Sequence, residues 1–254
     1  MKSKSAILSL ILLLLLMVSA AHDARADYKL VMAVHVDGYQ NQGQTVPARD
    51  DTSIIWISPG GARIDQADTA SFIFLADKAS MVMLDHREKK FMEVPMNAMA
   101  KLIEQQAAGD STKMAQAKQM MEMMRMKAKV TPTGETKMFG KWNCTKYLLS
   151  VEIAMTTTST ECWVTKDIPI DYALYAKVTQ AMKAFLPGYE DALKEMKKME
   201  GVQVHSVTTA SYQNINMRTV TDLVSAVETP VSKDMLAVPA GYTQSEVQLP
   251  GMHH

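Results

Sequence analysis

Short segments in which apolar residues recur at every second position fill the first part of the chain, and they restrict its fold more than any other feature. Turn-forming residues such as Pro59-Gly60-Gly61 separate several of them. The segments are YKLVMAVHV (28–36), TSIIWIS (52–58), ARID (62–65), SFIFLA (71–76), SMVMLD (80–85) and KKFMEV (89–94). Short strands joined by tight turns are typical of an antiparallel meander, in which one face is covered and the other contacts water. The apolar residues predicted to line the covered face are Ile55, Ile57, Phe72, Phe74, Met81, Met83 and Phe91.

The periodicity changes after Pro95. Helical composition is found at 95–108, 111–128, 170–185 and 189–199. Extended segments return at 138–155, 160–166, 202–212 and 217–228. Strands interrupted by two helical insertions predict an α+β fold dominated by antiparallel sheet.

The first 26 residues have the organisation of a secretory signal peptide. MKSK supplies a basic start, AILSLILLLLLMVSA an apolar run, and Ala24-Arg25-Ala26 a small-residue cleavage site. A retained membrane anchor is the alternative, but the run is short for a span of about 20 residues. We therefore expect a periplasmic or secreted protein that begins near Asp27 and has no integral membrane anchor after cleavage. The expected organisation is a signal peptide over 1–26, a single domain over 27–250 with helical insertions near 95–128 and 170–199, and a tail over 251–254.

Charge and motifs exclude several classes of function. The chain has 27 basic and 27 acidic residues and no block of like charges, so it lacks the basic footprint of a nucleic-acid-binding protein. The sequence contains no GxSxG, HExxH or Rossmann glycine motif. His35 and His205 lie in predicted strands and are expected to be structural. We predict a protein that is not an enzyme and that needs no cofactor.

Residues 114–126 contain six of the 22 methionines of the chain. On a helical wheel four of them form an apolar stripe, whereas Met123 and Met126 lie on the polar side. The stripe can simply pack on the sheet, because the unbranched thioether fills gaps in a core. It can also form one wall of an apolar cavity, since methionine-rich surfaces suit variable apolar partners.

A third hypothesis is a Cu(I) site, because thioether sulfur is a soft metal ligand. The candidate donors are Met120, Met123, Met124 and Met126. No cysteine or histidine lies among them, and the spacing is not a repeated MxxM run.

Cys144 and Cys162 are the two cysteines of the chain. In an oxidising compartment a disulfide between them is the default expectation, and it would contribute about 3 kcal/mol. The strand register that buries most apolar residues opposes it, because that register places Cys162 near Ile153, on the order of 30 Å from Cys144. A disulfide is slightly favoured over free thiols.

Four fragments carry a resemblance to a known family. They are LADKASMVMLDHREKKFMEVP (75–95), FGKWNCTKYLL (139–149), ECWVTKDI (161–168) and VETPVSKDMLAVPAGY (227–242). They resemble a family of exported bacterial proteins of unknown function that is similar to the lipoprotein-carrier superfamily, whose members ferry lipoproteins to the outer membrane. The resemblance implies a half-barrel, a curved antiparallel sheet wrapped around helices, with an apolar concavity that accepts acyl chains. It implies no catalytic residues.

The leading functional hypothesis is therefore a non-enzymatic exported protein that binds an apolar small molecule, a lipid or a lipidated protein. The predicted ligand-binding residues are Ile55, Ile57, Phe72, Phe74, Met81, Met83, Met120, Met121 and Met124. The alternatives are a Cu(I) binder that uses the methionine-rich helix and a purely structural interaction module of the cell envelope.

Overall fold

The computed structural model describes most of the chain between Asp27 and Ser245. The described residues are 17–18, 27–41, 43–95, 112, 115–116, 119, 122–154, 156–170, 187–212 and 215–245. Strands make up most of them, and α5 (Tyr189–Met196) is the α-helix whose bounds lie within them.

The strands have the following bounds. In chain order they are β1 (Met17–Val18), β2 (Tyr28–Val36), β3 (Tyr39–Asn41), β4 (Gln44–Val46), β5 (Arg49–Ser58), β6 (Gly61–Gln66), β7 (Ala70–Leu75), β8 (Ser80–Asp85), β9 (Lys90–Pro95), β10 (Lys127–Phe139), β11 (Trp142–Ile153), β12 (Thr156–Thr165), β13 (Gly201–Tyr212), β14 (Ile215–Glu228) and β15 (Thr243–Gln244). A 3-10 helix, η1 (Lys233–Leu236), lies between β14 and β15.

One sheet contains all of these strands except the β3–β4 hairpin. Its order is β10-β11-β12-β13-β14-β2-β5-β6-β7-β8-β9-β15, and β1 pairs with the start of β13. The pairing is antiparallel everywhere except between β9 and β15. The sheet therefore consists of two meanders, β5–β9 and β10–β14, which are joined through β2 because β2 pairs with both β14 and β5.

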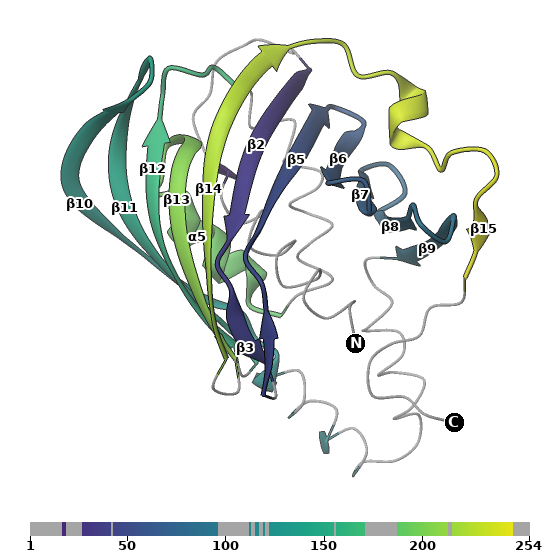
Figure 1. The fold of residues 1–254 in the computed structure, drawn as a ribbon, viewed down its shortest axis with the longest axis horizontal. Helices are drawn as coiled ribbons and strands as arrows, with labels where there is room; N and C mark the ends of the chain where they lie inside the picture. Colours follow the sequence, from purple (N-terminus) through teal and green to yellow (C-terminus); the bar gives the residue numbers. More distant parts are fainter. Residues whose placement is uncertain are drawn as a thin grey trace.

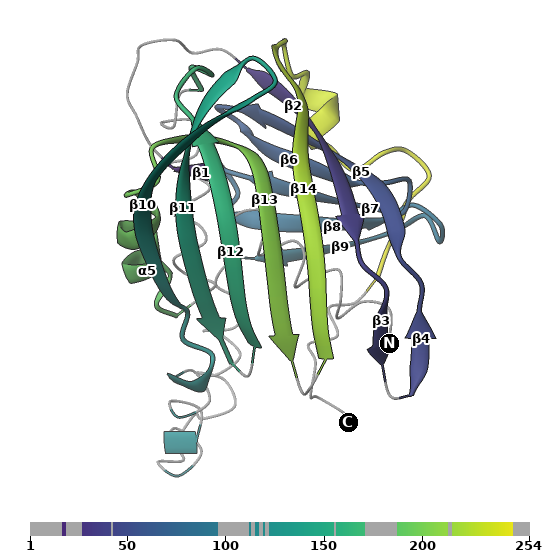
Figure 2. The same cartoon turned by 60° about the vertical axis from the view of Figure 1, so that its left-hand side comes forward.

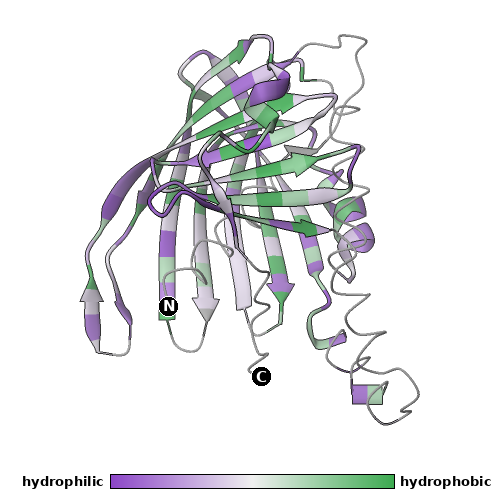
Figure 3. Ribbon diagram, turned by 90° about the vertical axis from the view of Figure 1, so that its right-hand side faces the viewer, coloured by the Kyte–Doolittle hydropathy of each residue, from purple (hydrophilic) through white to green (hydrophobic). Residues whose placement is uncertain are grey.

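The sheet is strongly curved, as Figure 1 shows for the sweep from β10 through β2 to β9. In Figure 2 the short strands β6–β9 pass behind the long strands of the second meander and cross them at a large angle. Buried residues of both meanders belong to one core cluster, so the concave face of the sheet is the main core of the molecule. Figure 3 shows that the strands of the first meander are largely apolar and that the loops between them are hydrophilic.

The expectation of an α+β fold with helices wrapped by the sheet is wrong, because the described chain is mostly β-strand. Helix α5 packs against the edge strand β10, where the backbone N–H of Val130 donates a hydrogen bond to Oε2 of Glu195 at 3.1 Å. One source of the error is residues 127–139, which form a complete strand although their sequence is polar and contains Pro132 and Gly134. Polar residues and proline are typical of an edge strand.

The predicted helices fall mainly outside the described residues. This applies to residues 95–108 beyond Pro95, to most of 111–121, and to 171–185. Where the description resumes, Glu122 and Met123 are helical, but the chain is extended from Lys127 onward. The predicted helix therefore ends several residues before 128, whereas the prediction of a helix at 189–199 agrees with α5.

A C-terminal segment, residues 229–245, covers the convex face of the first meander. Leu236, Val238 and Tyr242 pack against a second buried cluster made of Ile73, Val82 and Leu84. These strands are therefore buried on both faces, which accounts for their nearly continuous apolar sequences.

Candidate functional site

The concave face of the first meander is apolar and ordered in two cross-strand rows. One row runs Leu30, Ile55, Ile64, Phe72, Met83, and the next runs Tyr28, Ile57, Ala62, Phe74, Met81. These residues are buried, except that Met83 is partly buried against the same cluster. All six predicted ligand-binding residues of the sheet lie in these two rows and therefore share one face, because paired residues of adjacent antiparallel strands point to the same side.

The concave face of the second meander carries hydroxyl groups instead. Its buried members are Thr156, Thr158 and Thr160 of β12, Ser206 and Thr208 of β13, and Thr221 of β14. We call these six residues the hydroxyl stripe. Thr160 pairs with Thr208 and Cys162 pairs with Ser206, so the stripe is continuous from strand to strand.

Hydrogen bonds between neighbouring strands satisfy part of the stripe. The Oγ1 atoms of Thr160 and Thr208 lie 3.0 Å apart, and Oγ1 of Thr158 donates to the carbonyl oxygen of Val151 at 3.1 Å. Every buried polar residue in the described part of the chain is a serine, threonine or glutamine. The buried surface is therefore polar in places but carries no charge.

A border row separates the apolar rows from the hydroxyl stripe. It consists of Ser53 on β5, Met32 on β2, Leu223 on β14 and Gln203 on β13. Ser53 pairs with Met32, and Met32 pairs with Leu223. Gln203 lies on β13 just past the last pair with β14, His205 with Asp222, and beyond a bulge at Val204.

The border row contains two buried polar atoms without a hydrogen-bond partner among the described residues. They are Oγ of Ser53 and Oε1 of Gln203, and both side chains belong to residues that are 4% exposed. The other end of the Gln203 amide is satisfied, since Nε2 donates to Oγ of Ser206 at 2.9 Å. Buried polar atoms of this kind are rare, because an unpaired group costs about 1–3 kcal/mol.

The predicted methionine site is only partly described. Met120 and Met121 lie outside the described residues, and Met124 is half-buried. Met123 is 62% exposed, whereas Met126 is 1% exposed and belongs to the main core. The expectation that Met126 is exposed is wrong, because the helical spacing ends before it.

The expected disulfide is also absent, since Cys144 and Cys162 are both free and buried. Cys162 pairs with Tyr147 and Cys144 pairs with Thr165, so the two thiols lie in different rows and on opposite faces of the sheet. Ile153 pairs with Thr156, so the register differs from the expected one, which places Cys162 near Ile153. Burial raises the pKa of the Cys144 thiol to about 11, with a smaller contribution from Asp167, and burial raises the pKa of Cys162 above its ordinary value.

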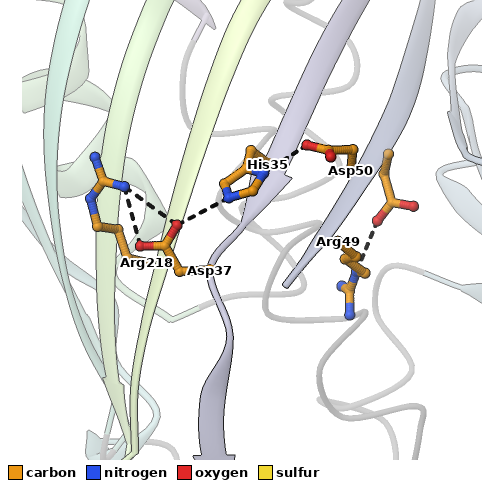
Figure 4. A network of polar contacts seen from close by, with 6 residues as sticks. His35, Asp37, Arg49, Asp50 and Arg218 are labelled. Carbon is orange, nitrogen blue, oxygen red and sulfur yellow. Dashed lines mark hydrogen bonds and ion pairs between the residues drawn. The ribbon is translucent and has the colours of Figure 1, made fainter. Parts of the chain in front are cut away.

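A polar network lies on the convex face, where the β3–β4 hairpin leaves the sheet (Figure 4). Nδ1 of His35 lies 2.6 Å from Asp50, Nε2 of His35 lies 3.2 Å from Asp37, and Arg218 contacts Asp37 at 3.2 Å. The hydrogen bond with Asp50 is the main cause that raises the pKa of His35. His205 makes the equivalent contact with Asp222 at 2.6 Å. Both histidines link neighbouring strands, as expected of structural residues.

A second polar cluster fixes the C-terminal segment. Oγ of Ser71 donates to Asp65 at 2.5 Å and lies 2.6 Å from Nε2 of His86, and Nδ1 of His86 lies 2.5 Å from Oη of Tyr242. Arg63 bonds Asp65 and the carbonyl oxygen of Met235. Ser71 is fully buried, and these contacts join the first meander to Met235 and Tyr242, so the cluster acts as a clasp for the C-terminal segment.

The described residues contain neither a group of three or more histidine, cysteine and carboxylate side chains suited to a metal ion nor a helix long and apolar enough to cross a membrane.

A family model matches most of the chain. The family described as "Domain of unknown function (DUF4412)" matches residues 57–242. No curated protein matches the sequence.

Two solved structures resemble the chain distantly. The structure of PNGF-II has a TM-score of 0.37 and 10% identity, over 86% of this chain and 31% of that protein, so this chain spans less than a third of its length. A putative outer membrane lipoprotein-sorting protein domain from Vibrio parahaemolyticus has a TM-score of 0.32 and 6% identity, over 84% of this chain and 90% of that one. Neither similarity is close enough to carry an argument about function.

Proposed function

We propose that this chain, which belongs to the family described as "Domain of unknown function (DUF4412)", is an exported, non-enzymatic protein that shelters an apolar ligand on the concave face of its sheet. The proposed ligands are a lipid, an acyl chain or the acyl groups of a lipidated protein. The proposed location is the periplasm or the exterior of the cell, reached through the signal peptide expected over residues 1–26.

The single observation that supports this function best is the pair of apolar rows. They bring side chains from five neighbouring strands onto one uncharged face that is shielded from water. Binding sites for small apolar molecules are concave and mainly apolar, with a few polar groups that orient the ligand. Transferring an acyl chain from water to such a face contributes about 0.8 kcal/mol per methylene group before ordering costs.

The first experiment asks whether a ligand is present. Protein purified from its own host is examined by native mass spectrometry, and its organic extract is analysed for lipids. We expect a bound species that disappears after extraction. A protein that carries no ligand and that also fails to bind a hydrophobic fluorescent dye would contradict the proposal.

The second experiment places the ligand on the concave face. Met83→Gln introduces an unbranched polar side chain at the end of an apolar row, and we expect it to weaken dye binding roughly tenfold. Met138→Gln is the matched control, because Met138 is 57% exposed on the edge strand β10. Equal affinities for the two variants would place the dye elsewhere.

A further inference from the structure

The border row suggests what kind of apolar ligand the concave face takes. On β2 the rows that contain Tyr28 and Leu30 are apolar, the next row contains Met32, and the rows beyond it pair Val34 with Thr221 and Val36 with Thr219. The concave face therefore changes from apolar to hydroxyl-bearing along the strand direction. The two unpartnered polar atoms lie at this change.

Ser53 and Gln203 lie about 14 Å apart along the sheet, because three strand spacings separate β5 from β13. A single polar group of a ligand contacts only one of them, whereas a small polar head with two or more groups spans part of this row. Gln203 is the better anchor, because Ser206 fixes its amide from the other end.

The chemistry of these atoms restricts the polar group. The free end of a glutamine amide is either an acceptor or a donor, depending on how the amide is oriented, and a serine hydroxyl is both. A ligand hydroxyl satisfies every one of these cases. An ionised group does not, because no buried side chain of the described chain carries a compensating charge and an unpaired buried charge is strongly disfavoured.

We propose that the ligand is a neutral amphiphile, with its acyl chain along the apolar rows and a hydroxyl-bearing head at the border row that hydrogen-bonds to Gln203. This inference rests on the proposed function, since it assigns the ligand class of the same face. It predicts that ligands with the same acyl chain but different head groups bind with different affinities.

The test compares three ligands with the same fourteen-carbon chain, each below its aggregation concentration. They are 1-monomyristoylglycerol, methyl myristate and myristate at pH 8. We expect the glyceride to bind about tenfold more tightly than the ester, which corresponds to one hydrogen bond that the ester cannot donate. We expect myristate to bind less tightly than the glyceride, because its carboxylate is ionised.

Gln203→Leu removes the amide at nearly constant volume, and we expect the ratio of glyceride to ester affinity to fall toward one. Gln40→Leu is the control, because Gln40 lies on the exposed β3–β4 hairpin outside the main sheet. A wild-type protein that binds the ester or myristate as tightly as the glyceride would overturn the inference. A variant whose ratio equals that of the wild type would overturn the role of Gln203.

Unfolding by urea without ligand provides an independent readout. In the Ser206→Ala background, where the hydrogen bond between Gln203 and Ser206 is already absent, Gln203→Leu removes an unpaired buried amide, so we expect the unfolding midpoint of the double variant to equal or exceed that of Ser206→Ala alone. A clearly lower midpoint would show that Gln203 is a satisfied structural residue and would overturn the inference. Absence of binding by all three ligands would instead contradict the proposed function itself, so the two failures are distinguishable.

Discussion

The two meanders solve the same packing problem in different ways. Strands β6–β9 have 6 residues each, and the first meander buries apolar side chains on both faces. Strands β10–β14 have 10 to 14 residues, and on their concave face apolar side chains alternate with hydroxyl groups that bond across strands. Short strands thus obtain their stability from two covered faces, whereas the long strands combine a longer hydrogen-bonded ladder with a more polar core.

The largest expected effect concerns the reactivity of the two cysteines, which should be absent in the folded protein and complete after unfolding. Only the second meander carries thiols, one on each face, and both are buried with raised pKa values. Because the reactive species is the thiolate, we expect neither thiol of the folded protein to react with an aromatic disulfide reagent at pH 7.5. Two thiols should react after denaturation in guanidinium. Rapid reaction of the folded protein would show that solvent reaches the thiols of this meander. No reaction after denaturation would show that the two cysteines form a disulfide.

Truncation of an apolar row should have the largest effect on stability. Phe74→Ala removes a side chain that is 1% exposed, and we expect it to lower the free energy of unfolding by about 3–5 kcal/mol. Val224→Ala, at a position that is 61% exposed, should change it by less than about 0.5 kcal/mol. Urea denaturation measures both, and similar values for the two would contradict the idea that the first meander depends on its apolar face.

The hydroxyl stripe should show a smaller effect with a distinctive pattern. Thr160→Val or Thr208→Val alone leaves the other hydroxyl without its partner and should cost about 1–3 kcal/mol. The double variant should cost less than the sum of the two, because no unpaired group remains. Additive values in a double-mutant cycle would mean that this hydrogen bond does not stabilise the second meander.

The smallest effect is expected at the junction of the meanders, where His35 on β2 contacts Asp50 on β5. The pKa of His35 is raised above its ordinary value of 6.5, so its contribution to stability is present below that pH and is lost as the pH rises through the higher folded value. The melting temperature of the wild type should therefore exceed that of Asp50→Asn by more at pH 5.5 than at pH 8.5. Asp68→Asn, in an exposed turn, is the control. If the difference in melting temperature between wild type and Asp50→Asn does not change with pH, protonation of His35 does not contribute to stability.

The sequence predicts most of the apolar face, because a period of two assigns every second residue to the same side of a strand. Ile55, Phe72 and Met83 accordingly lie in one row. The prediction for Phe91 is wrong, since Phe91 pairs with Leu84 and packs in the second cluster on the convex face. The hydroxyl stripe is not predictable in this way, since alternating threonines are equally typical of a solvent-exposed face. Gln203 gives no local signal at all, because its position depends on a bulge at Val204 and on pairing with Val164, which lies far before it in the sequence.

Two further errors have definite physical causes. No strand is expected between the helix predicted up to 128 and the strand predicted from 138, a stretch that contains Pro132 and Gly134. An edge strand, however, needs a partner on one side only and tolerates both residues. Counting helical turns places Met126 on the polar side of a helix, but helical periodicity carries no information once the chain becomes extended. Helix ends without a clear capping signal are therefore the weakest point of such predictions.

The central position of β2 has a consequence for biogenesis. One edge of β2 pairs with β5, which follows it closely in the chain, whereas the other edge pairs with β14, which is synthesised only after β5–β13. Until β14 arrives, the N-terminal half exposes a nine-residue template whose free amides and carbonyls can recruit foreign strands. Nascent chains of this protein thus remain vulnerable to aggregation until β14 has been synthesised, and truncations that remove β14 make that vulnerability permanent.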